Sequence, residues 1–168
     1  LSTMTLELPM TTPKHHTAKI DEPSELPIPD GYKPFNFQLG GPFMGINGPL
    51  LHKRDGKQLL LGMRVEKRHC NPMDVCHGGM LMSFVDMAMP MGVVYQENIN
   101  RFLPTISLNT DFLAPVPLDS WLEARTDVLR VTRSMVFAQC LVQADGITAV
   151  RASGVFKLGA EYHHPAQK

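Results

Sequence analysis

The chain has 168 residues, of which 43% are hydrophobic, and its 16 Lys and Arg residues are balanced by 16 Asp and Glu residues. This length suits one domain with a substantial core and is short for two. A zero net charge offers no basic footprint for nucleic acid or for an anionic membrane surface. Three cysteines, an odd and low number, are typical of a reducing compartment rather than of a disulfide framework, so we expect a cytoplasmic protein.

The N-terminal part differs from the rest because residues 1–34 contain six prolines and show no apolar periodicity. It is interpreted as a proline-rich extension that wraps the domain or is partly disordered. Orderly patterning begins at Phe35 and predicts one domain over residues 35–160, followed by a tail at 161–168. Residues 1–12 lack a basic leader and a continuous apolar run, so no secretory signal is expected.

The first element that the sequence predicts after the extension is a β-hairpin. Two runs with strand character, residues 48–53 and 58–67, flank Arg54-Asp55-Gly56-Lys57. Asp-Gly between such runs is a strong hairpin signal. A polar segment at 68–76 then leads to a long helix.

That helix is predicted over residues 78–96, where Leu81, Val85 and Ala88 share one face and the other faces are apolar as well. A helix that is apolar on all sides must be covered on all sides. Asp86 is the only charge between residues 78 and 95. Because a carboxylate at the centre of a membrane span would cost about 2.5–3.5 kcal/mol, we expect the central helix of a globular domain and no membrane insertion.

Four strand-like runs follow the helix, at residues 105–112, 121–131, 135–144 and 147–158. The last two are joined at Asp145-Gly146, a second hairpin signal. Two strands, one long helix and four more strands predict an α+β fold, in which one antiparallel sheet of five to six strands wraps around the helix.

The segment His77-Gly78-Gly79 lies where the loop becomes the helix. The first N–H groups of a helix have no internal partner, and its dipole favours negative charge. This arrangement can stabilise the oxyanion of a carbonyl under attack. The alternative is that the two glycines only permit a tight turn.

Asp86 is the second candidate, because a lone carboxylate in an apolar helix is expensive to bury and is seldom placed there for packing. A structural, hydrogen-bonded aspartate is the alternative. Pro90 cannot donate to the carbonyl of Asp86, so a bend near this residue is expected.

These motifs resemble those of the small hotdog-fold acyl-CoA thioesterases of the phenylacetate-degradation type, relatives of the 4-hydroxybenzoyl-CoA thioesterases. The resemblance covers about residues 35–158. It rests on Asn71, on His77-Gly78-Gly79 six residues later, and on Asp86 nine residues after the histidine. Leu113-Ala114-Pro115 and Thr132-Arg133-Ser134 also match strand ends of the family.

The resemblance implies a hotdog fold and a set of site residues. The catalytic carboxylate falls on Asp86 and the oxyanion donor on the backbone of Gly78. The loop amide that places the water or thioester falls on Asn71, and a hydroxyl used in some members falls on Thr105. The site residues expected on this basis are Asn71, His77, Gly78, Asp86 and Thr105 for catalysis, with Gly79, Met80, Arg133 and Ser134 for substrate binding.

Gly78 and Asp86 are eight residues apart on one predicted helix. At about 1.5 Å per residue, roughly 12 Å of helix separates them. Two groups this far apart cannot serve one carbonyl, so they would have to come from different chains. We therefore expect a homodimer or homotetramer with its active sites at the dimer interface. The resemblance implies the same arrangement.

The same loop carries groups that could bind a metal or act as a cysteine nucleophile. His69, Cys70, Cys76 and His77 offer metal-ligating atoms, but five residues separate the cysteines, instead of the two to four usual in structural zinc sites. A nucleophilic Cys76 beside His77 is a further alternative, although neighbouring residues of an extended loop point apart. We expect His77 to order the loop, the methionines to form an adaptable apolar pocket or core, and Arg133 to meet CoA phosphates or remain a solvated charge.

The leading hypothesis is hydrolysis of an acyl-CoA thioester by water, with Asp86 as general base or nucleophile. Because thiolate is a good leaving group, no metal or other cofactor is expected, and coenzyme A enters only as part of the substrate. Two alternatives remain: a hotdog enoyl-CoA hydratase, and a non-catalytic acyl-CoA-binding sensor.

Overall fold

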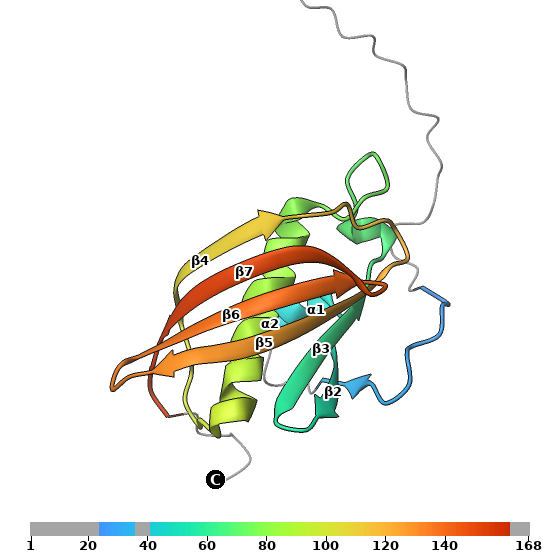
Figure 1. Ribbon diagram of the computed structural model, residues 1–168. Helices are drawn as coiled ribbons and strands as arrows, with labels where there is room; N and C mark the ends of the chain where they lie inside the picture. The colour runs from blue at the N-terminus through green and yellow to red at the C-terminus, as the bar shows by residue number, and fades with distance from the viewer. Residues whose placement is uncertain (1–23, 36–40, 162–168) are drawn as a thin grey trace, which may run out of the picture.

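The computed structural model describes residues 24–35 and 41–161 of the chain. One antiparallel sheet curves around one long helix (Figure 1). The strand order across the seven-stranded sheet is β1-β2-β3-β5-β6-β7-β4. The strands are β1 (Lys33–Pro34), β2 (Leu51–Asp55), β3 (Gln58–Arg64), β4 (Thr105–Phe112), β5 (Trp121–Val131), β6 (Met135–Ala144) and β7 (Ile147–Lys157), and the helices are α1 (Gly41–Asn47) and α2 (Gly78–Glu97).

The sheet has one face against α2 and one toward solvent. β6 shows this most clearly, since its residues alternate strictly between exposed and buried. The buried set meets the apolar face of α2, which includes Phe84, Val85 and Met89. At Gly92 the helix approaches β5 so closely that an added Cβ would lie 2.7 Å from Thr126 Cβ. Packing of the sheet on α2 therefore forms the core.

α2 is covered on only one side, in contrast to the expectation of a helix buried all round. Its face away from the sheet is partly open, and Met82 and Asp86 are exposed there. The expected burial of Asp86 is therefore wrong for the single chain. By length and composition alone α2 could cross a membrane, yet 44% of its most apolar 18-residue window is already buried against the sheet. Pro90 lies inside α2, which continues through it to Glu97.

The predicted α+β architecture matches this topology, and β4, β5 and β6 have the expected bounds. The first hairpin is tighter than expected, because Asp55 pairs with Gln58 and only Gly56 and Lys57 form the turn. Arg54 and Asp55 therefore belong to β2. The two-residue β1 raises the number of strands above the expected five to six, and α1 was not expected.

The described part of the N-terminal extension, residues 24–34, lies against the domain. The Tyr32 hydroxyl donates to Glu123 Oε2 at 2.6 Å, and its ring packs edge-on to Trp121. Gly62 leaves room for both rings, since an added Cβ would lie 2.2 Å from Trp121 and 2.7 Å from Tyr32. The expected extension covers residues 1–34, and its residues 1–23 lie outside the described residues, as does most of the expected tail, 162–168.

Candidate active site

The loop before α2 is fixed on both sides by backbone hydrogen bonds. The His77 N–H donates to the His69 carbonyl at 2.8 Å, and the Cys76 N–H donates to the Val116 carbonyl at 2.7 Å. Within the loop, Asn71 Oδ1 accepts from the N–H of Met73 at 2.9 Å and from that of Val75 at 3.4 Å. Asn71 therefore shapes the turn through its oxygen. The loop delivers the chain to the helix start in a defined position.

His77 caps α2. Its Nδ1 accepts the Gly79 N–H at 2.9 Å, as expected for a residue that orders the loop. Because the Gly79 donor is used in this way, it is not free for a substrate. The N–H of Gly78 donates no hydrogen bond within the described parts of the chain. Gly78 is thus the first-turn residue whose donor stays available for an external oxygen atom.

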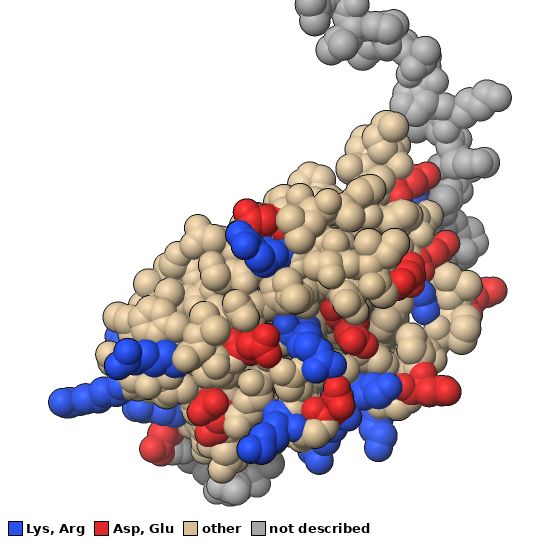
Figure 2. Space-filling model, in the orientation of Figure 1, with Lys and Arg blue, Asp and Glu red and all other residues tan. Residues whose placement is uncertain are grey.

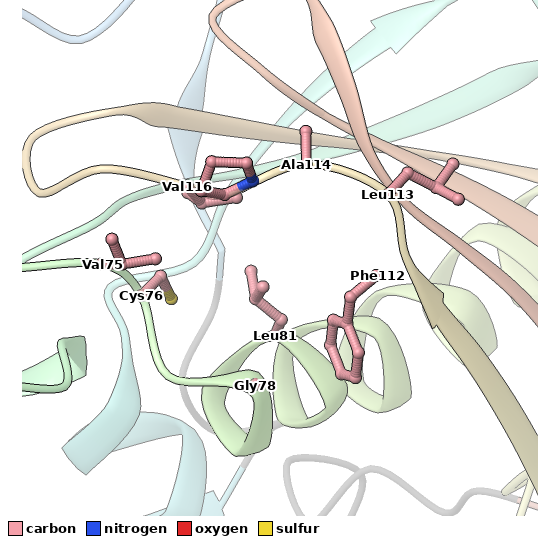
Figure 3. Close-up of a pocket in the computed structure, with 9 residues that line it drawn as sticks. Val75, Cys76, Gly78, Leu81, Phe112, Leu113, Ala114 and Val116 are labelled. Atoms are coloured by element: carbon pink, nitrogen blue, oxygen red, sulfur yellow. The ribbon is translucent and has the colours of Figure 1, made fainter. Parts of the chain in front are cut away.

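An apolar pocket of about 350 Å³ opens beside Gly78. The pocket is lined by Val75, Cys76, Gly78, Leu81, Phe112, Leu113, Ala114, Pro115 and Val116. Figure 3 shows Leu81 rising from α2 toward Val116, and the ring of Phe112 reaching from the end of β4 to the first turns of the helix. A Cβ added at Gly78 would lie 3.3 Å from Phe112 Cζ, so the ring lies directly over the glycine. Every side chain of the lining is apolar or a thiol.

Asp86 lies elsewhere on α2 and contacts the other end of β4. The Thr105 hydroxyl donates to Asp86 Oδ1 at 2.7 Å. Simple alternation would turn Thr105 away from the helix, because Leu108 and Thr110 already occupy the inner face of β4, opposite Gly154 and Ala152 of β7. A β-bulge between Thr105 and Ser107 shifts the alternation by one residue and redirects Thr105 toward Asp86.

One chain therefore carries two separate halves of the expected site. Gly78 and Phe112 lie at one end of β4, and Asp86 and Thr105 lie at the other. Gly78 and Asp86 lie eight positions apart on one continuous α-helix, so roughly 12 Å of axis separates them. The predicted separation of these two groups is thus present in the structure.

The remaining predicted residues occupy different places. Met80 is buried in the core and does not line the pocket. Arg133 and Ser134 are exposed in the turn between β5 and β6. The Ser134 carbonyl accepts from the Leu158 N–H, and the neighbouring Lys157 N–H donates to the Pro104 carbonyl. This turn therefore lies beside Thr105, at the end of β4 that carries Asp86.

The thiols of the loop are poor nucleophiles. Burial, with a smaller effect of Cys70, raises the pKa of Cys76 to about 12. Its sulfur contacts the His77 carbonyl rather than an imidazole nitrogen that could take its proton. These features disfavour the alternative of a Cys76–His77 nucleophile. Within residues 24–35 and 41–161, no group of three or more His, Cys, Asp or Glu side chains could hold a metal ion.

Comparison with known proteins identifies the architecture. A model of the "Thioesterase superfamily" matches residues 73–150, which include the loop, α2 and β4–β6. The PaaI protein of the E. coli phenylacetic acid degradation operon superposes with a TM-score of 0.65 at 17% identity, covering 74% of this chain and 89% of that one. The chain has the hotdog fold, which it shares with thioesterases of known structure. The expected fold and the resemblance to thioesterases of the phenylacetate-degradation type are thereby confirmed.

Two further relatives bear on the activity of this thioesterase-fold chain. A Pseudomonas aeruginosa protein described as a "Putative esterase" is 28% identical over 132 residues, covering 78% of this chain and 97% of the relative. A hypothetical thioesterase from Streptococcus pneumoniae, solved with coenzyme A, superposes with a TM-score of 0.57 at 14% identity, covering 79% of this chain and 88% of that one. The family match and the relative from P. aeruginosa support hydrolysis of a thioester in general terms, whereas the S. pneumoniae structure shows a shared fold.

Neither Phe112 nor the bulge at Thr105 was expected from the sequence. In the sequence Phe112 looks like an ordinary strand residue. Its place over Gly78 depends on the pairing of β4 with β7, and β5 and β6 lie between these two strands along the chain. The signal that could have identified it is its position next to Leu113-Ala114-Pro115, the segment that forms the far wall of the pocket.

Proposed function

We propose that this protein hydrolyses acyl-CoA thioesters at a site assembled from two copies of the chain. The observation that carries the proposal is the division of the candidate groups between the two ends of β4. Gly78 and the apolar pocket lie at the Phe112 end, whereas Asp86 lies hydrogen-bonded to Thr105 at the other end.

β4 offers the edge at which two copies would meet. Among the described strands it pairs only with β7, and it ends the described sheet on that side. Large apolar side chains are exposed along it and around it, namely Met82, Phe102, Ile106, Phe112 and Leu113. In Figure 2 charged side chains gather over the lower part of the view, where β2, β3 and β5 lie in Figure 1, and fewer cover the upper part, where β4 lies. The charge of Asp111 on β4 is paired with Arg151 of the neighbouring β7. An open edge with apolar neighbours favours association.

Antiparallel pairing of two β4 strands about a two-fold axis brings the Thr105 end of one strand to the Phe112 end of the other. Asp86 of one chain then approaches Gly78 of its partner, and each dimer contains two equal sites. Arg133 and Ser134 lie beside Thr105, so they would belong with Asp86, where Arg133 can meet the phosphates of coenzyme A.

The chemistry follows from these groups. The thioester carbonyl oxygen accepts the Gly78 N–H, whose helix-terminal position stabilises the negative charge that develops during attack. Asp86 either takes a proton from the attacking water or attacks the carbonyl itself, and the C–S bond breaks to release coenzyme A as thiolate. In the first case the water oxygen becomes part of the free acid directly. In the second case water then cleaves the acyl–Asp86 anhydride, which releases the acid and restores the carboxylate. The uncharged pocket of about 350 Å³ accepts an apolar acyl group. No step needs a metal or redox cofactor.

The decisive experiment is a panel of acyl-CoA substrates monitored with a thiol reagent. Release of free thiol at a rate proportional to enzyme supports the proposal. A hydratase would consume enoyl-CoA without releasing thiol, and a sensor would bind the ligand without turnover. Either of those results would contradict hydrolysis as the function.

A further inference from the structure

A second cavity, of about 420 Å³, lies at the opposite edge of the sheet and is lined by Gly31, Lys33, His52 and Arg54. Lys33 of β1 pairs directly with His52 of β2, and Arg54 follows two residues later. Cross-strand partners and residues two apart share a face of a sheet, so the three basic side chains point to one side. We call these three residues the basic cluster.

The basic cluster lies on the inner side of the sheet. Within the hairpin, His52 pairs with Leu61 and Arg54 pairs with Leu59, and both leucines are buried in the core. The guanidinium of Arg54 lies 5.5 Å from the ring centre of Tyr95, near the C-terminal end of α2. The cavity therefore lies between the outer hairpin and the last turns of the helix.

Aromatic rings, not carboxylates, contact two of these three side chains. Tyr95 supports Arg54, and the ring of Phe35 packs edge-on to His52 with centroids 5.8 Å apart. Within the described parts of the chain, neither Lys33 nor Arg54 forms a salt bridge. The neighbouring carboxylate of Asp55 is bonded instead to Arg125 at 2.9 Å. The positive charge around the cavity is thus not neutralised by the described residues.

His52 also has a hydrogen-bonding atom that the described residues do not use. Its Nδ1 atom is buried and has no hydrogen-bond partner in the described structure. Burial, with the charges of Arg54 and Lys33, lowers the pKa of this imidazole. An anion in the cavity would reverse both effects, because it would accept from the imidazole and offset the two neighbouring charges.

We propose that the basic cluster binds the phosphate group of a small organic phosphate. A guanidinium fork, an ammonium group and an imidazole around one cavity match the several oxygen atoms of a phosphate better than the two of a carboxylate. The cavity is larger than a bare phosphate needs, which leaves space for an organic part.

This site is distinct from the proposed active site. β1 and β4 are the two opposite edges of the sheet. Along α2, Tyr95 lies seventeen positions after Gly78, which is roughly 26 Å of helix. The phosphate can belong to a free metabolite or to a coenzyme A molecule, and an experiment can distinguish these sources.

The test uses the full chain and follows the His52 imidazole by NMR during titration with inorganic phosphate, with chloride at equal ionic strength as the reference. We expect a saturable shift and a raised His52 pKa. Lys33→Gln and Arg54→Gln should each weaken binding about tenfold or more. Lys53→Gln is the matched control, because Lys53 lies between His52 and Arg54 but on the other face of β2, against Tyr32, and it should change affinity less than about twofold.

Failure to saturate, or equal weakening by Lys53→Gln, would overturn the site. A repeat with coenzyme A identifies the source and upholds the site in either case. If coenzyme A displaces phosphate and Arg54→Gln raises KM for acyl-CoA, the phosphate is that of the coenzyme. If neither occurs, the ligand is a separate organic phosphate.

Discussion

Thr105 donates a hydrogen bond to Asp86, and this contact links the open edge of the sheet to the central helix. It leaves Asp86 Oδ2 free of any hydrogen bond from the described residues. A carboxylate held at one oxygen and open at the other is oriented for proton transfer or attack. The residues of the candidate site give four predictions on activity, and the buried His69 gives one on stability.

Replacement of Thr105 by Val keeps the shape of the side chain and removes the hydroxyl. Because a hydrogen bond to a charged group contributes about 1.5–3 kcal/mol, kcat should fall about tenfold or more while KM changes little. Thr105→Ser is the control, since it keeps the donor and should retain most of the activity. Steady-state kinetics of the two variants measure the difference. Loss of activity in Thr105→Ser together with full activity in Thr105→Val would show that the methyl group, not the hydroxyl, matters.

Replacement of Asp86 by Asn removes the negative charge with little change of volume. We expect a loss of about 10²–10⁴-fold in kcat, the usual range for a general base, and more if Asp86 is the nucleophile. Since Asp86 is exposed in the single chain, the fold should remain intact, which circular dichroism can check. Turnover above roughly a tenth of the wild-type value would remove Asp86 from the mechanism.

A mixture of two inactive variants should recover activity if the site is shared. Asp86→Asn damages one half, and Gly78→Pro removes the free N–H of the other. In a mixed dimer one site is intact and the other carries both lesions. Co-refolding at equal ratio should therefore give about a quarter of the wild-type activity. Both variants must first be shown to fold and to dimerise. If verified subunit exchange restores nothing, the two groups do not act together across chains.

Truncation of Phe112 to Ala should widen the pocket over Gly78. The ring forms one wall and contacts the space above the glycine, so its removal opens room for a bulkier acyl group. We expect kcat/KM to shift about tenfold or more toward larger acyl groups, since each methylene in an apolar pocket contributes about 1–3 kcal/mol. Leu129→Ala is the control, because Leu129 is an exposed apolar residue outside this pocket. An unchanged ranking of substrates would show that the acyl group lies elsewhere.

His69 should make stability depend on pH. Burial and the nearby Arg68 lower its pKa to about 4. Between its unfolded pKa near 6.5 and that value, the unfolded chain binds a proton that the folded chain excludes, so stability falls as pH drops from about 6.5 toward 4. His69→Asn can still accept the Glu66 N–H and does not titrate. Urea midpoints at several pH values should show a flatter acid limb for this variant. Parallel curves would exclude His69 as the cause.

Local patterns predicted most of the fold. Alternation of apolar and polar residues indicated β5 and β7, and Asp-Gly turns joined the hairpins, because side-chain period and turn chemistry act over a few residues. The division of Gly78 and Asp86 followed from helix geometry alone. The bulge at Thr105 and the position of Phe112 depend on the register between β4 and β7, which is set by packing across the whole sheet.

The exposure of Asp86 was also beyond local reasoning. An apolar helix with one charge suggested burial, but the sheet curves around only one side of α2. Which side remains open depends on how many strands fold around the helix and where the sheet ends. The basic cluster was missed for a similar reason, since Lys33 meets His52 only through the pairing of the two-residue β1.

The two edges of the sheet differ in a way that limits its growth. β4 presents eight residues without a partner strand beyond it, whereas β1 has two residues, one of them Pro34, which lacks an N–H donor. A chain with two long unpaired edge strands could add another copy at each edge and form a filament. Here the short proline edge offers almost nothing to a further strand, so pairing through β4 would use up the long edges of both chains. Addition of further copies by strand pairing would then stop at a closed dimer.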